Sequence, residues 1–125
     1  MFEATFKIAA LIESNEQGQR TFKIYQHEEP FTSSAFSSLV AALYQREVYQ
    51  MLQAGDALTI MIHMNPPWRK IERTLRFRED LQFEGDAMQA PTTDLLPVIT
   101  TMSEQFLQKM LPGDVFTVIF RVQRL

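Results

Sequence analysis

Apolar and polar residues alternate along several stretches of the chain, a pattern typical of strands that bury one face. In residues 2–12, Ile8 and Ile12 share one side, while Glu3 and Lys7 take the other. Alternation, or an apolar run bounded by turn residues, predicts further strands over 21–27, 57–64, 69–78 and 115–123. A shorter strand is predicted over 81–84. We therefore expect five to six strands.

Two other stretches repeat apolar residues at the three- to four-residue spacing of an amphipathic helix. One follows the hydroxyl-rich run 32–34 and ends at Gly55, and the other begins near Asp94 and ends at Gly113. Hydroxyls can accept hydrogen bonds from the free amides of a first turn. Glycine readily takes the left-handed conformation that closes a helix. Pro97 is tolerated in the first turn of the second helix, where its missing amide would be unpaired anyway.

The end of each predicted helix belongs to a repeated phrase. MLQAGDALTIMIHM at 51–64 matches KMLPGDVFTVIFRV at 109–122. The strands of the two copies also match in register. In each strand every second residue, and therefore one face of the strand, is strongly apolar. These positions are Leu58, Ile60, Ile62 and Met64 in the first copy and Phe116, Val118, Phe120 and Val122 in the second. The repeat predicts a duplicated unit of strand, helix, Gly-Asp turn and strand.

The order of the elements predicts one α+β domain over residues 1–125. Two strands, a helix, two or three strands, a second helix and a last strand would form a single, mainly antiparallel sheet. Both helices have one apolar stripe, so they should cover the same face of this sheet. A pseudo-duplicated βαβ core, ferredoxin-like or related, is the expected topology.

Composition removes several classes of function. The net charge is −3 and cysteine is absent, which excludes a disulfide framework, thiolate metal sites and a cysteine nucleophile. No apolar stretch approaches the roughly 18 residues that a membrane helix needs. The N-terminal sequence has no basic leader or small-residue cleavage site, so it does not predict a secretory signal. We expect a cytoplasmic protein without a membrane partner.

Catalytic and metal chemistry finds little support in the residue pattern. His27 and His63 are the only histidines, and their spacing matches no metal-binding motif. No serine lies in a nucleophile elbow, and the four glycines form no phosphate-binding loop. The repeated Asp56 and Asp114 are better explained as turn residues than as a catalytic pair. We therefore favour a non-enzymatic role with no metal and no cofactor.

Basic residues concentrate in WRKIERTLRFR at 68–78, between Trp68 and Arg78. Aromatic and basic side chains on a strand can hold single-stranded nucleic acid. Acidic neighbours, Glu72 and Glu79 among them, offset this charge. A salt-bridged outer strand is the favoured interpretation, so nucleic-acid binding through 68–78 is only an alternative.

The second face of the sheet suggests the leading functional hypothesis. Apolar residues on that parity would point away from the helices, and such a patch on a monomer usually marks a contact surface. We expect a self-associating interaction, assembly or adaptor module whose partner-binding residues are Leu11, Met61, Trp68, Arg76 and Ile119. The segment 85–93 could instead cover this face. Another alternative is a small-molecule cleft between the two repeats, lined by Tyr25, Met61, Trp68 and Phe83.

Overall fold

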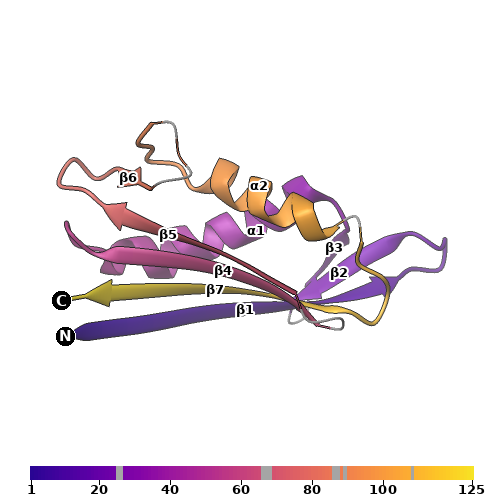
Figure 1. Cartoon of the computed structure of the whole chain (residues 1–125). Coiled ribbons are helices and arrows are strands. Elements are labelled where there is room, and N and C mark those ends of the chain that lie inside the picture. Colours follow the sequence, from indigo (N-terminus) through magenta and orange to yellow (C-terminus); the bar gives the residue numbers. More distant parts are fainter. Residues whose placement is uncertain (25–26, 66–68, 86–87, 89, 108) are drawn as a thin grey trace.

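The computed structural model of the chain describes residues 1–24, 27–65, 69–85, 88, 90–107 and 109–125. Within these residues, seven strands and two α-helices form the fold (Figure 1). The strands are β1 (Phe2–Ser14), β2 (Arg20–Ile24), β3 (His27–Pro30), β4 (Ala57–Asn65), β5 (Arg69–Phe77), β6 (Phe83–Glu84) and β7 (Val115–Arg124). The helices are α1 (Ser33–Leu43) and α2 (Leu96–Leu107).

All seven strands belong to one antiparallel sheet in the order β3-β2-β1-β7-β4-β5-β6. The α+β class and the single antiparallel sheet are thus confirmed. The predicted count of five to six strands is too low by at least one, because residues 27–30 pair with β2 as a strand of their own. The C-terminal strand β7 lies in the middle of the sheet, between β1 and β4.

The ferredoxin-like arrangement is not confirmed. In the first predicted unit, β1 and β7 separate β2 from β4, and in the second, β4 and β5 separate β6 from β7. The repeat instead appears as direct pairing, since β4 and β7 are antiparallel neighbours along their whole length. Sequence similarity between the two copies therefore arises where two strands share the same central environment of the sheet.

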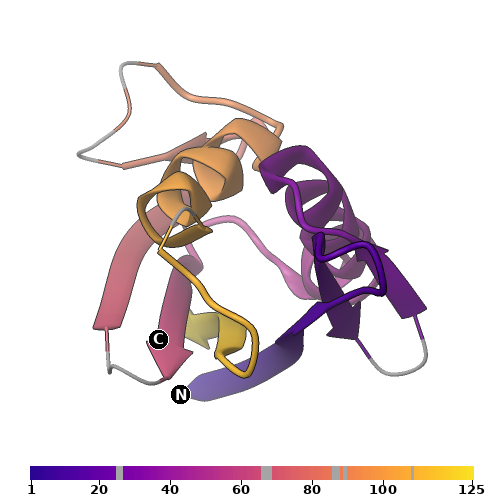
Figure 2. The same cartoon turned by 90° about the vertical axis from the view of Figure 1, so that its right-hand side faces the viewer.

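Both helices cover one face of the sheet, which curves around them (Figure 2). The apolar parity of β4 and β7 faces the helices, and its eight predicted members are each at most 1% exposed. Aromatic rings fill the space between the layers. The ring of Phe36 in α1, for example, lies edge-on to that of Phe116 in β7, with centroids 4.5 Å apart. No helix among the described residues lies on the other face of the sheet, and we call it the open face.

The first helix ends earlier than its apolar spacing predicts. After Leu43 the chain widens into a π-helical turn (Tyr44–Val48), followed by a 3₁₀ turn (Tyr49–Met51). This path keeps Tyr44 and Val48 in the core at 3% and 0% exposure. The ring of Tyr49 contacts Phe77 edge-on, with centroids 5.8 Å apart. Packing against the sheet therefore decides the helix end, and Gly55 closes the turn that follows it.

The two Gly-Asp turns have the same hydrogen bonds. Gly55 N donates to Phe77 O and Gly113 N donates to Ile12 O, each at 2.7 Å. Phe77 N and Ile12 N donate back to the carbonyls of the two aspartates, each at 2.9 Å. Each turn thus continues the pairing of its strand with the neighbouring strand. The repeated phrase is a repeated turn that begins a central strand.

Candidate functional site

The open face is formed by those side chains of the central strands that alternate with the buried ones. Strand pairing places Met61 of β4 opposite Ile119 of β7, as the hypothesis of a contact surface requires. Lys7 of β1 lies beside Ile119, and Glu72 of β5 lies beside Met61. We call these four residues the central row. Two apolar side chains thus occupy its middle and opposite charges its two ends.

Solvent exposure separates the two faces. Ile60 and Val118, which point to the helices, are fully buried, whereas Met61 and Ile119 are half-buried. On an open antiparallel sheet this intermediate value results from shielding by neighbours on the same face. Met61 and Ile119 therefore keep part of their apolar surface in water.

A second apolar pair lies toward one end of the same face. Leu11 of β1 is directly opposite Val115 of β7, and each is 37% exposed. Ala9, two residues along β1, is also exposed. The predicted contact residues Leu11, Met61 and Ile119 therefore share one face, over β1, β7 and β4. Trp68, also predicted to bind the partner, lies outside the described residues.

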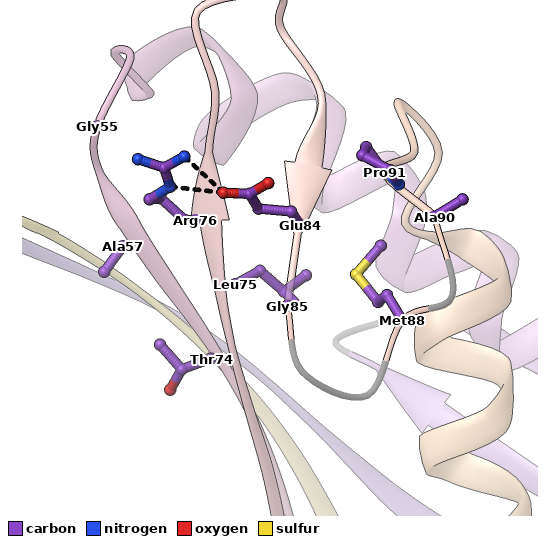
Figure 3. A pocket seen from close by; sticks show the side chains of 10 residues that line it. All are labelled: Gly55, Ala57, Thr74, Leu75, Arg76, Glu84, Gly85, Met88, Ala90 and Pro91. Atoms are coloured by element: carbon purple, nitrogen blue, oxygen red, sulfur yellow. Dashed lines mark hydrogen bonds and ion pairs between the residues drawn. The ribbon is translucent and has the colours of Figure 1, made fainter.

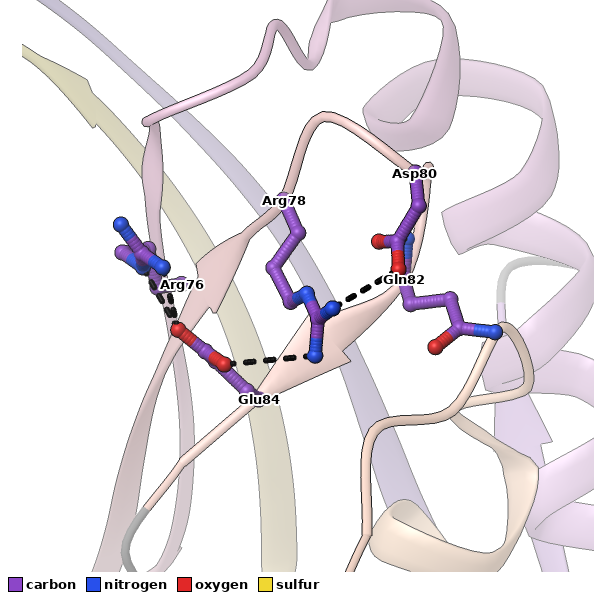
Figure 4. Close-up of polar contacts among 5 residues, drawn as sticks. All are labelled: Arg76, Arg78, Asp80, Gln82 and Glu84. Carbon is purple, nitrogen blue, oxygen red and sulfur yellow. Dashed lines mark hydrogen bonds and ion pairs between the residues drawn. The ribbon is translucent and has the colours of Figure 1, made fainter.

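Arg76 is at the other end of this face, where β5 meets the short edge strand β6 (Figure 3). Its Nε donates to Oε1 of Glu84 at 2.8 Å, and its Nη2 contacts the same oxygen. Glu84 also approaches Arg78, whose guanidinium is 2.9 Å from Asp80 (Figure 4). This chain of charges is half-exposed, so each pair adds little to stability.

A hollow of about 690 Å³ lies beside Arg76 at the β5–β6 edge (Figure 3). Its described lining comes from the start of β4, the end of β5 and the segment after β6. The lining residues are Gly55, Ala57, Thr74, Leu75, Arg76, Glu84, Gly85, Met88, Ala90 and Pro91. The only charges among them are the paired Arg76 and Glu84. A ligand that binds either charge would compete with this pair.

The hollow differs from the cleft expected between the two repeats. Phe83, a predicted lining residue, is fully buried against Tyr44 and Phe77 on the helix side of the sheet. Met61 is on the open face, so the two side chains do not share a cleft. Tyr25 and Trp68 lie outside the described residues. Among the described residues of 85–93, Gly85, Met88, Ala90 and Pro91 line the edge hollow.

Residues 69–78 of the basic stretch form β5 and the start of the turn that follows it, and their charges are largely paired. Lys70 is 3.5 Å from Glu72, and Arg76 and Arg78 contact the acidic residues described above. Arg73 points to the other face and donates to the carbonyl of Glu72 at 2.9 Å. These pairs compete with any phosphate for the same cations, which favours the salt-bridged interpretation of this strand.

His63 lies on the open face beside Lys70 of β5 and Thr117 of β7. Burial, with smaller effects from Lys70 and Lys7, lowers the pKa of His63 below its ordinary value. A neutral imidazole is therefore favoured at neutral pH. The structure describes no side chain of His27, and its described residues contain no cluster of three metal-ligating side chains.

Asp56 and Asp114 act as turn residues. Oδ2 of Asp56 accepts a hydrogen bond from Gln53 N at 2.8 Å, and Oδ2 of Asp114 accepts one from Leu111 N at 2.9 Å. Asp56 has a further partner that no sequence pattern indicated. Arg124 donates from Nε and Nη2 to the two carboxylate oxygens of Asp56 at 2.9 and 2.8 Å. This bidentate bond lowers the pKa of Asp56.

Comparison with protein-family models, with curated proteins and with solved structures found no match for this chain. In the described part of the chain, neither α1 nor α2 has the length and apolar character that a membrane-spanning helix requires.

Proposed function

We propose that this chain is a non-enzymatic interaction module that associates with a second copy of itself through the open face of its sheet. The observation that carries the proposal is the position of Met61 and Ile119 as cross-strand neighbours on the face without helices. Leu11 and Val115 extend the apolar surface along β1 and β7. Association would remove these side chains from water, which is favourable in proportion to the apolar area buried.

The edges of the sheet are poorly suited to the same task. Edge-to-edge pairing needs a free strand long enough to form a ladder. The edge strand β6 has two residues, and the edge strand β3 ends in Pro30, which has no amide to donate. Face-to-face packing is therefore the favoured mode of association.

A second copy is the favoured occupant because the face is mixed in charge. The central row ends in Lys7 on one side and Glu72 on the other. A strongly acidic or basic partner would be repelled by one of the two ends. A surface with the same two charges in the opposite order would match both, and a rotated copy of this face provides it.

The test is Met61→Glu, measured by sedimentation velocity for mass and circular dichroism for fold. We expect wild type to sediment at twice the mass of one chain and Met61→Glu at the mass of one chain, with unchanged fold. A carboxylate at this position stays hydrated in the monomer but would be buried without a partner in the dimer.

Two controls define the result. Leu111→Glu introduces the same charge at a residue that is 66% exposed and lies before β7, so dimer mass should be retained. Ile60→Asp places a carboxylate in the core and should unfold the chain, since an unpaired buried charge costs several kcal/mol, of order 3 or more. A monomeric wild type at every accessible concentration would contradict the proposal.

A further inference from the structure

The open face carries two rows of residues whose charged ends are of opposite sign. In the central row, Lys7 and Glu72 flank Ile119 and Met61. A second row lies four residues away on each strand, at the end of the sheet where β1 begins and β7 ends. It consists of Glu3, Gln123, Ala57 and Arg76. The order of charge is reversed between the rows, because β1 provides a cation in the first and an anion in the second.

Given the self-association proposed above, we infer that the two copies are related by a two-fold axis parallel to β4 and β7 and lying between them. Rotation about this axis exchanges the β1 side of one copy with the β5 side of the other and leaves each row at its own level. Each Lys7 then faces the second copy's Glu72. Ile119 faces the second copy's Met61.

The second row obeys the same symmetry. The rotation brings Glu3 of each copy over the second copy's Arg76. Both groups have contacts within the chain, since Gln123 Nε2 donates to Glu3 at 3.3 Å and Arg76 pairs with Glu84. Such half-exposed contacts can be shared with a second partner at little cost. The same axis thus forms four opposite-charge pairs, two from each row.

A two-fold axis perpendicular to the strands, lying between the two faces, would bring like charges together. With that axis at the central row, each residue of the row would face its own counterpart, so Lys7 would meet Lys7 and Glu72 would meet Glu72. Like charges brought together at an interface disfavour that arrangement. The charge pattern therefore selects between two packings that bury the same apolar residues.

The curvature of the sheet agrees with this placement of side chains. The helices occupy the concave side, so the open face is convex and two such faces separate toward their margins (Figure 2). Sheets packed face to face are roughly 10 Å apart at their closest region. Ile119 and Met61 fit that central region, while lysine, arginine and glutamate at the margins are long enough to reach across a wider gap.

One residue opposes the arrangement. Arg121 lies between the two rows, opposite Thr59, and the proposed axis brings the two Arg121 guanidinium groups near each other. Arg121→Gln should therefore tighten the dimer. Packing about the axis perpendicular to the strands predicts no such gain, because each Arg121 would then face Thr117 of the second copy.

The deciding experiment is a charge exchange between Lys7 and Glu72, both exposed. Each single variant, Lys7→Glu and Glu72→Lys, creates two like-charge contacts per dimer and should raise the dissociation constant about tenfold at low salt. The double variant restores opposite charges and should return to within about threefold of wild type. Glu104→Lys, an exposed charge reversal on α2, is the control and should leave the dissociation constant unchanged.

A second measurement uses the absence of cysteine from the chain. Mixing Met61→Cys with Ile119→Cys chains and adding a bismaleimide with a spacer of about 10 Å should yield mainly the mixed cross-linked dimer, because these two positions face each other across the gap between the sheets. Predominant formation of the Ile119→Cys homodimer would overturn the proposed axis. Additive effects in the charge exchange, with no recovery in the double variant, would overturn it as well.

The outcomes separate the two proposals. If Met61→Glu dissociates the dimer but the charge exchange shows no recovery, the open face remains the interface and the axis is wrong. If wild type is monomeric and Met61→Glu changes nothing, both proposals fail.

Discussion

Gly55 and Gly113 show, at the scale of single residues, what the repeated phrase encodes. Their φ angles are +92° and +97°, and a methyl group added at either would meet no other atom within 4 Å. Backbone conformation alone therefore requires glycine at both positions. The left-handed conformation predicted for both glycines is confirmed, because the requirement is local. The prediction that they end the two helices is wrong, since α1 ends at Leu43 and α2 at Leu107.

Gly55→Ala and Gly113→Ala should each destabilise the fold by about 1 kcal/mol, the usual cost of a left-handed backbone for an L-residue. Urea denaturation measures this change. Gly85→Ala is an instructive comparison, since a Cβ there would lie 2.7 Å from Leu75 Cδ2 and act by collision instead. Unchanged stability of either turn variant would show that the turn does not need its positive φ.

At the scale of elements, alternation predicted which face of each central strand is buried. It could not predict which strands are neighbours. The order β1-β7-β4 depends on contacts between residues far apart in the chain, such as Ile8 with Val118. For the same reason Met61 and Ile119 were recognisable as candidates, but their position beside Lys7 and Glu72 depended on the register.

The ends of helices and edge strands were predicted less well, again for a physical reason. The second helix begins at Leu96, close to the predicted start near Asp94, whose carboxylate accepts a hydrogen bond from Leu96 N at 2.9 Å. The first helix ends where Tyr44 and Val48 must both reach the core. That requirement comes from the sheet, and no local pattern at 44–51 carries it.

One residue in the turn between β5 and β6 has a strained backbone conformation. Leu81 has a φ of +64° and is 54% exposed. The turn is closed by Arg78 N donating to Gln82 O at 2.8 Å. Leu81→Gly should stabilise the protein by roughly 0.5–1 kcal/mol, because it relieves the strained backbone and removes little buried surface.

Thermal denaturation followed by circular dichroism tests this, with Leu111→Gly as the control at another exposed leucine. A lower stability of Leu81→Gly than of wild type would mean that the Leu81 side chain contributes packing that outweighs the backbone strain.

At the scale of the whole molecule, the contact of Asp56 with Arg124 joins the end of the central strand β7 to the turn that begins β4. Asp56 is 1% exposed, and Arg124 also donates to Met51 O at 3.0 Å. The contact links residues that are 68 positions apart. Its loss should therefore weaken the pairing of central strands that holds the two halves of the sheet together.

Acid unfolding tests this link. The hydrogen bond from Arg124 lowers the pKa of Asp56 in the folded state, so the stability it contributes is fully present above the unfolded value of about 3.9. That contribution is lost as the pH falls through the lower, folded pKa.

Asp56→Asn should be less stable than wild type at pH near 7, and the difference should shrink with decreasing pH below about 4. Asp114→Asn, which changes the equivalent turn away from Arg124, is the matched control. Urea denaturation at a series of pH values measures all three proteins. A stability difference between wild type and Asp56→Asn that stays constant through the acid range would show that the carboxylate does not depend on its arginine partner.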